Sequence, residues 1–220
     1  MLSLKQGLSL DSIRLQGAWS PDDEASLEAW YKNAVGITLN GSRVSKWDDS
    51  STNSHDMAQS TTAEQPGYSG GILTFDGVDD NLASSQINLA ECTLAIRGDF
   101  TSGDGTLLGD DESNAFLSFQ STTVLRVKVV AGLIDFTLAS GEFKDGYIVI
   151  TRDGSDNVNA YYNGTSISAE QNRPGTIKVD NMGSTAGAGG FFDGTIKEVQ
   201  IYSSTSAALT ANINSRLASL

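Results

Sequence analysis

Cysteine and histidine are nearly absent from the sequence. One cysteine among 220 residues cannot form a disulfide within the chain. That residue, Cys92, alternates with Leu94 and Ile96, which predicts a small buried side chain rather than a reactive thiol. The single histidine, His55, lies in a polar stretch. One histidine argues against a histidine-based metal site and against a Ser-His-Asp triad.

Positive charge and long apolar runs are also scarce. Lysine and arginine total 14 against 27 acidic residues, which gives a formal net charge of −13 and a pI near 4.3. An acidic surface repels phosphate groups, so we expect neither nucleic-acid binding nor docking on anionic membranes. No run of about 18 apolar residues occurs, and the N-terminus shows no Sec signal peptide. We therefore expect a chain made in the cytoplasm without membrane insertion.

Glycine is frequent, with 23 residues, whereas proline is limited to 3. Many short runs of Val, Ile, Phe and Tyr lie between clusters of Gly, Asn, Asp and Ser, which is typical of an all-β protein with tight turns. A chain of 220 residues can form one β-sandwich. Strands are predicted at 37–39, 44–47, 72–75, 93–100, 106–109, 115–120, 124–130, 133–138, 147–152, 158–162, 176–179 and 192–202, with a long polar loop over 48–71 and a short strand near Met57 inside it.

Two helices are predicted, one near each end. Ser20 can cap a helix and Pro21 suits its first position, so we expect a helix that runs through Trp30 and ends near Asn33. A second, amphipathic helix is expected over 206–220, with an apolar stripe formed by Leu209, Ile213, Leu217 and Leu220.

Residues 1–19 carry six large aliphatic side chains whose spacing fits neither a strand nor a helix. Burying each of them is worth roughly 1.5–3 kcal/mol, so they must pack against protein. Packing on the chain's own domain and packing on a neighbouring subunit both remain open. We predict an attachment arm over 1–19 and a self-contained domain over 20–220, with partner-binding residues Leu2, Leu4, Leu8, Leu10, Ile13 and Leu15.

The segment 73–82 predicts a hairpin corner with a carboxylate-rich tip. An apolar strand runs into the turn dipeptide Asp76-Gly77 and then into two adjacent carboxylates. A second Asp-Gly pair starts at Asp193, and both pairs cap strands that we expect to lie close together. Hard oxygen ligands of this kind suit calcium, although turn formation through Asx hydrogen bonds is the alternative. The calcium candidates are Asp76, Asp79, Asp80 and Asp193.

The phrase Phe-Asp-Gly-Val-Asp-Asp-Asn-Leu over 75–82, together with 27–31 and 193–202, resembles the laminin-G-like domains of the concanavalin A-like superfamily. The resemblance implies a two-sheet antiparallel jelly-roll β-sandwich with short N-terminal and C-terminal helices. Many relatives are similar in holding a calcium ion at a sandwich corner or loop rim. The first forty residues also resemble structural proteins of tailed phages, particularly marine ones.

Glycosidases of this superfamily place carboxylates on one strand as Glu-x-Asp-x-Glu, and Glu198 has no carboxylate at 196 or 200. We therefore expect no enzymatic activity. The leading hypothesis is a non-enzymatic structural or decoration protein of a phage virion, on the capsid or the tail, that contacts other virion proteins or copies of itself. The alternative is a carbohydrate-binding module or adhesin domain. Tyr161 and Tyr162 are candidate glycan-binding residues, and core packing is the competing interpretation.

Overall fold

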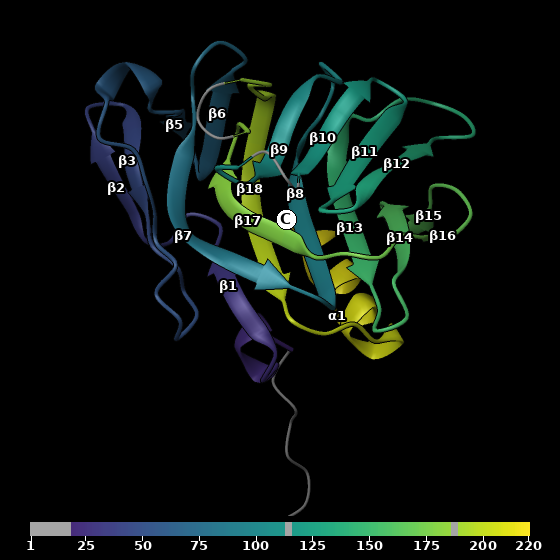
Figure 1. Ribbon diagram of the computed structural model, residues 1–220. Helices are drawn as coiled ribbons and strands as arrows, with labels where there is room; N and C mark the ends of the chain where they lie inside the picture. The colour runs from purple at the N-terminus through teal and green to yellow at the C-terminus, as the bar shows by residue number, and fades with distance from the viewer. Residues whose placement is uncertain (1–18, 113–115, 186–188) are drawn as a thin grey trace, which may run out of the picture.

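The computed structural model describes residues 19–112, 116–185 and 189–220 (Figure 1). Two 3-10 turns, η2 (Pro21–Asp23) and η3 (Thr62–Glu64), and one α-helix, α1 (Ala207–Leu217), accompany a large set of strands. The strands are β1 (Leu27–Tyr31), β2 (Ile37–Asn40), β3 (Arg43–Trp47), β4 (Met57–Ala58), β5 (Gly67–Ser69), β6 (Ile72–Asp76), β7 (Leu82–Leu89), β8 (Cys92–Asp99), β9 (Gly105–Gly109), β10 (Phe116–Ser121), β11 (Val124–Val129), β12 (Gly132–Thr137), β13 (Asp145–Arg152), β14 (Asn157–Tyr162), β15 (Thr165–Ser166), β16 (Gln171–Asn172), β17 (Ile177–Met182) and β18 (Asp193–Tyr202).

The strands form two antiparallel layers. One layer has the order β6–β18–β8–β13–β14, and β1 pairs with the far end of β18 on the same side as β6. The other layer has the order β4–β7–β17–β9–β10–β11–β12. Strands β3 and β5 join the layers along one side. Figure 1 shows β7 and β17 in front of β18 and β8, and the prediction of an all-β sandwich is confirmed.

The main core lies between the layers. Strand β8 is central, because Ile96 lies opposite Ile148 of β13 on one side and Val199 of β18 on the other. Rings of Phe119 and Phe143 meet edge to face at 5.0 Å. Cys92 is fully buried in this core as predicted, and burial raises the pKa of its thiol to about 12.

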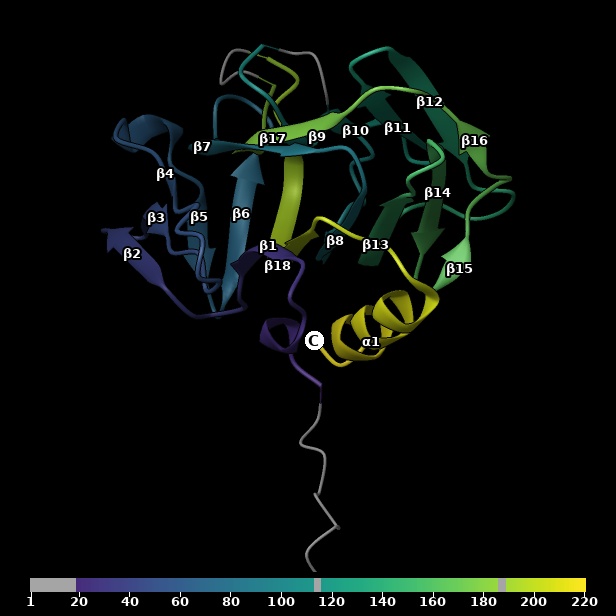
Figure 2. The ribbon, with the colours of Figure 1, turned by 60° about the horizontal axis from the view of Figure 1, so that its bottom comes forward.

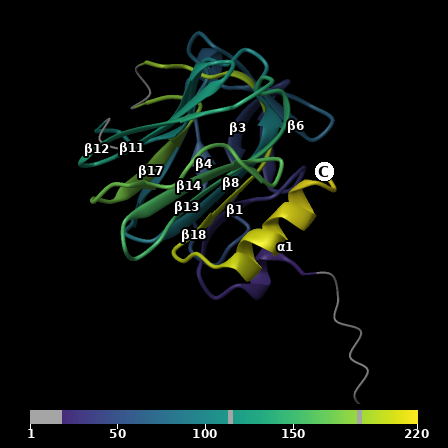
Figure 3. The same ribbon diagram turned by 90° about the vertical axis from the view of Figure 1, so that its right-hand side faces the viewer.

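Helix α1 covers the outer face of the β18–β8–β13 layer (Figure 3). Its side chains Leu209, Ile213 and Leu217 form a second apolar cluster with Ala95, Tyr147, Val149 and Tyr202. Leu220 lies beyond the end of the helix and is exposed, so the predicted stripe is one residue too long. Within the described ranges, no helix combines the length and the apolar content needed to cross a bilayer.

The predicted helix over residues 20–33 is wrong. Ser20 does begin a helical turn, with its backbone N–H donating to the carboxylate of Asp23 at 2.9 Å, but η2 ends there. The following segment is strand β1, in which Trp30 lies opposite Gln200 of β18. Pairing with β18 satisfies the backbone of β1 and buries its aromatic side chains, which outweighs the helical start signal.

The polar stretch 48–71 is less irregular than predicted, since it contains β4, η3 and β5. The short strand at Met57 is confirmed, whereas β7 was not predicted. The proposed arm lies outside the described residues except for Trp19. That side chain packs against the second apolar cluster, and its indole N–H donates to Glu24 at 2.9 Å. Trp19 therefore belongs to the domain.

Candidate functional site

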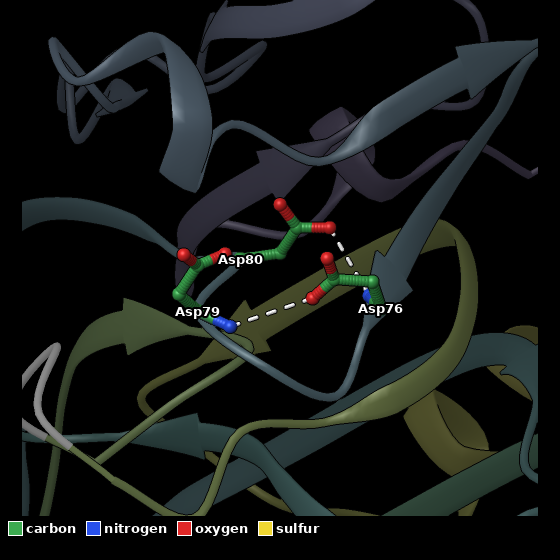
Figure 4. A group of neighbouring side chains, drawn as sticks. All are labelled: Asp76, Asp79 and Asp80. Atoms are coloured by element: carbon green, nitrogen blue, oxygen red, sulfur yellow. Dashed lines mark hydrogen bonds between the residues drawn. The ribbon is translucent and has the colours of Figure 1, made fainter.

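Three of the predicted carboxylates gather at the corner between β6 and β7 (Figure 4). Oxygens of Asp76, Asp79 and Asp80 all lie within 4.8 Å of one another. Gly77 has a φ of 73°, and a Cβ at that position would come within 2.9 Å of Asp193 Cβ. Glycine is therefore required for the corner to close.

Hydrogen bonds inside the corner use part of this oxygen set. Asp76 Oδ1 accepts the backbone N–H groups of Val78 at 2.9 Å and Asp79 at 3.4 Å, which is an Asx turn. Asp80 Oδ2 accepts the Asp76 N–H at 3.0 Å, and Asp80 Oδ1 accepts Arg43 Nη1 at 3.2 Å. The turn-forming role is thus visible in the contacts.

Asp80 is only 2% exposed, and its surroundings disfavour the charged form. Burial, followed by the nearby charge of Asp76, raises the pKa of Asp80 to about 6. The Asp76 N–H and the Arg43 guanidinium act in the opposite direction without cancelling the effect. A cation placed among these carboxylates would lower that pKa again.

The fourth calcium candidate stands apart from this group. Asp193 lies opposite Asp76 in the β6–β18 register, as predicted, but its side chain is exposed and its oxygens are outside the 4.8 Å cluster. Calcium takes six to eight oxygens, and the corner offers three clustered carboxylates. Residues 76, 79 and 80 could hold such an ion with added backbone or water oxygens, and calcium binding stays a prediction.

A second carboxylate with many hydrogen bonds is Glu198, on the outer face of β18. It is fully buried. Arg216 of α1 donates to both oxygens, from Nε at 2.5 Å and from Nη2 at 2.8 Å. Trp30 Nε1, Gln200 Nε2 and the Asn33 N–H supply three further hydrogen bonds at 3.0, 2.7 and 3.2 Å. Helix α1 and the Trp30 side chain of β1 cover this face.

Aromatic and polar groups extend the Glu198 network. The Arg216 guanidinium lies 4.9 Å from the centre of the Trp30 ring, and Lys32 Nζ lies 4.7 Å from it, as cation–π contacts require. Tyr202 donates from its hydroxyl to Gln200 Oε1 at 2.8 Å. Burial and the Glu198 charge raise the pKa of Tyr202 far above its usual range. The network fixes α1 to the sheet.

A polar groove lies between α1 and the outer face of β13 and β14, and it encloses about 430 Å³. The strands contribute one wall of the groove. Thr151 of β13 lies opposite Asn159 of β14, and Tyr161 follows two residues later on the same face, because side chains alternate between the two faces of a strand. Tyr161 is half-buried, with part of its ring against the second apolar cluster. Asp153 and Asn157 close one end.

The helix wall of the groove comes from Thr205, Ser206, Thr210 and Asn214. Thr210 and Asn214 are four residues apart, so they lie on one side of α1 beside its apolar stripe. Asn214 Oδ1 is buried and has no hydrogen-bond partner within the described ranges. The hydroxyls of Thr151, Tyr161 and Thr210 make no hydrogen bond to the described residues. These three hydroxyls, rather than the enclosed Asn214 Oδ1, can meet a ligand.

Only one of the two predicted tyrosines contributes to this groove. Tyr162 points to the opposite face of β14, where its ring meets Phe143 edge to face at 5.1 Å and its hydroxyl accepts the Lys144 N–H at 2.8 Å. Sequence reasoning missed Thr151, Thr210 and Asn214. Thr210 and Asn214 are four residues apart and lie beside the apolar stripe of the predicted helix, which was the available signal. The sequence does not show which face of the sheet receives the helix, because that depends on tertiary packing.

Comparison with proteins of known structure identifies the fold of the chain. No protein-family model matches the sequence, and no curated protein is similar to it at a significant level. Among solved structures, domain 4 of AbnA, a GH43 extracellular arabinanase from Geobacillus stearothermophilus solved with arabinotriose, matches with a TM-score of 0.62 and 15% identity over 86% of this chain and 97% of that domain. Trypanosoma rangeli sialidase matches with a TM-score of 0.57 and 15% identity over 88% of this chain.

The binding domain of botulinum neurotoxin serotype G also matches, with a TM-score of 0.55 and 13% identity over 87% of this chain. The chain has the fold of these β-sandwich domains. It spans 33% of the sialidase chain and 50% of the neurotoxin domain, but nearly the whole arabinanase domain. The expected concanavalin A-like architecture agrees with these neighbours, and at identities of 13–15% the likeness shows the fold.

Proposed function

We propose that this chain is a non-enzymatic glycan-binding domain and that the groove between α1 and the β13–β14 strands binds the glycan. The observation that carries the proposal is a groove lined by the hydroxyls of Thr151 and Thr210 and by Tyr161. Saccharides present rows of hydroxyl groups and apolar ring faces. They can therefore form hydrogen bonds with the threonines and pack on Tyr161.

The dimensions of the groove suit a short oligosaccharide. Small-molecule sites commonly enclose about 300–1,000 Å³, and the groove encloses about 430 Å³. The arabinanase domain that this chain matches nearly end to end was solved with a trisaccharide, which supports a saccharide ligand for this fold.

Binding without cleavage is proposed because the groove lacks a catalytic pair. Hydrolysis of a glycosidic bond ordinarily uses two carboxyl groups on opposite sides of that bond. Asp153 is the one carboxylate among the described residues that line the groove. Its Oδ1 accepts the N–H groups of Ser155 at 2.8 Å and Asn157 at 2.9 Å, so it is occupied in shaping a turn.

The finer assignment to a phage virion is also a proposal. It is supported by the resemblance of the first forty residues to structural proteins of tailed phages and by the predicted apolar arm over 1–19. An arm attached to a particle and a glycan-binding domain on its surface are compatible roles. Mass spectrometry of purified phage particles would test the location.

The glycan proposal is tested with Thr210→Val and with Asn212→Ala as the control. Both residues lie on α1, but Asn212 lies outside the groove. Valine keeps the size of the half-buried Thr210 side chain and removes a hydroxyl that makes no hydrogen bond to the described residues, so Thr210→Val should melt close to the parent. Its binding to an oligosaccharide array should fall about tenfold, which corresponds to one lost hydrogen bond. Equal binding by both variants, or no array binding by the parent, would contradict the proposal.

A further inference from the structure

We infer that Glu170 is a positioning residue of the groove. It holds the Asn159 side chain so that Asn159 Oδ1 faces the groove and accepts a hydrogen bond from a saccharide hydroxyl. This inference rests on the proposed function and adds two residues that determine which ligand groups the groove recognises.

Two asparagines of β14, Asn157 and Asn159, line the groove, and their side-chain contacts differ. Asn157 uses both ends of its amide, because Nδ2 donates to Asp153 Oδ2 at 3.1 Å and Oδ1 accepts Asn172 Nδ2 at 2.9 Å. Asn159 uses one end. Its Nδ2 donates to Glu170 Oε2 at 2.7 Å, and its Oδ1 makes no hydrogen bond to the described residues. Asn159 is therefore the asparagine whose oxygen is left for a ligand.

The contact with Glu170 determines which way the Asn159 amide points. An ionised carboxylate only accepts hydrogen bonds, so the amino end of the amide must be turned toward Glu170. Glu170 directly precedes β16, whose Gln171 pairs with Val158 of β14, and β16 lies on the side of β14 away from β13 (Figure 2). The nitrogen and the oxygen of an amide diverge from one carbon atom. Asn159 Oδ1 is therefore directed toward β13, which is where the groove runs.

On that side, Asn159 has Thr151 as its neighbour. The register places the two residues directly opposite each other, so their side chains are adjacent on the outer face of the sheet. Asn159 is half-buried, and its Oδ1 is not closed off as Asn214 Oδ1 is. A saccharide hydroxyl that donates to Asn159 Oδ1 thus lies close to the Thr151 hydroxyl, which can both donate and accept.

Glu170 acts on binding rather than on folding. Its side chain is exposed, so the loss of its contact with Asn159 should change the free energy of unfolding little. A hydrogen bond to a charged acceptor is stronger than one between neutral groups, and this one holds the amide in one orientation. Without it, the last torsion of the asparagine has two broad preferred orientations, and only one presents the oxygen to the groove. Apparent affinity falls with the fraction of molecules in that orientation.

The test is a double-mutant cycle, measured as binding to the array oligosaccharide that the parent binds most tightly. Asn159→Ala removes the acceptor and should weaken binding about tenfold. Glu170→Ala keeps the acceptor but frees its orientation, and should weaken binding about threefold. Because Glu170 acts through Asn159, adding Glu170→Ala to Asn159→Ala should cause no further loss. Both single variants should melt close to the parent.

A pair of conservative substitutions provides a second readout. Asn159→Asp places two carboxylates together and should weaken binding. Adding Glu170→Gln supplies an amide N–H that donates to one oxygen of the new carboxylate and leaves the other oxygen for the ligand, so binding should recover about threefold. Glu142→Ala is the matched control, because Glu142 is also exposed, accepts one side-chain hydrogen bond, from Thr122 at 3.2 Å, and lies outside the groove.

The outcomes separate this inference from the proposed function. Parent-like binding by either single variant, equal losses from Glu170→Ala with and without Asn159→Ala, or an equal loss from Glu142→Ala would overturn the positioning role and leave glycan binding intact. An array without any bound glycan would overturn the proposed function together with this inference.

Discussion

Glu198 and Asp80 are both buried carboxylates, and their neighbours differ in charge. Glu198 accepts five N–H donors, two of them from the Arg216 guanidinium. Asp80 accepts one backbone N–H and one arginine N–H, and it lies within 4.8 Å of two other carboxylates. The first site surrounds a negative charge with donors, whereas the second concentrates negative charge at a corner.

The comparison shows that burial alone does not determine what a carboxylate does. Donors on α1, β1 and β18 form hydrogen bonds with Glu198, which thereby holds the helix on the sheet. Around Asp80, burial and the charge of Asp76 outweigh the contribution of Arg43, and the pKa of Asp80 is about 6. Asp80 is therefore the group whose charge responds to mild acid or to a cation.

The largest expected effect comes from Glu198→Ala. The substitution leaves the partly buried Arg216 guanidinium and the buried Trp30 Nε1–H without their acceptor, so we expect a loss of about 3–5 kcal/mol in the free energy of unfolding, measured by urea denaturation. Asp135→Ala is the matched control, because the Asp135 carboxylate accepts hydrogen bonds from Arg126 Nε at 2.7 Å and Nη2 at 2.8 Å on the exposed surface. That surface pair should contribute about 0.2–1 kcal/mol. Equal losses would contradict the distinction between buried and exposed pairs.

The next effect is the pH dependence that Asp80 contributes. Its pKa is about 6 in the folded chain, against 3.8 for an ordinary aspartate, so the folded state binds more protons between these values. Stability from this group is fully present below pH 3.8 and is lost as the pH rises through about 6. The change is about 3 kcal/mol.

This dependence is measured as the difference in unfolding free energy between the parent and Asp80→Asn at pH 4 and pH 7.5. The parent should lose about 2.5 kcal/mol relative to the variant over that range, because the unfolded carboxyl is already more than half ionised at pH 4. Asp193→Asn serves as the control, since Asp193 lies opposite Asp76 on β18, is exposed, and is not among the groups that shift the pKa of Asp80. A parent whose stability relative to Asp80→Asn rises with pH would contradict the assigned direction.

Calcium would give the corner the positive charge that Arg216 gives to Glu198. We predict that calcium raises the melting temperature at pH 7.5 and that chelator reverses the rise, with a stabilisation of about 2.7 kcal/mol at a hundredfold excess over Kd. Asp79→Asn should abolish the response. Unchanged melting with calcium and with chelator would leave Asp76, Asp79 and Asp80 as turn formers.

Local patterns predicted the sheet elements well where side chains alternate or form apolar runs. Strands β8, β11 and β13 lie within one or two residues of their predicted bounds. The pattern failed at β1, whose helical start signal extends for one turn only, and at β7, where Ser84, Ser85 and Gln86 interrupt the apolar residues. In both strands, pairing with a distant partner decides the structure.

The candidate site was predictable only in part. Tyr161 was named from the sequence, and the Asp76–Asp80 corner followed from the turn dipeptide. Glu198 and Asn214 could not be recognised, because their surroundings come from α1 docking on β18 and β13. The helix pattern predicts an apolar stripe but does not tell which face of which sheet receives it.

The hydrogen bond from Trp30 to Glu198 joins residues 168 positions apart in the chain. Pairing of β1 with β18 therefore closes a loop of that length. The conformational entropy of the chain that is lost on closing the loop opposes the formation of this contact. Chains dominated by such distant pairings fold in milliseconds to seconds rather than microseconds. Trp30 becomes buried when β1 pairs with β18. The change in Trp30 fluorescence during refolding should therefore report the rate at which the sandwich closes.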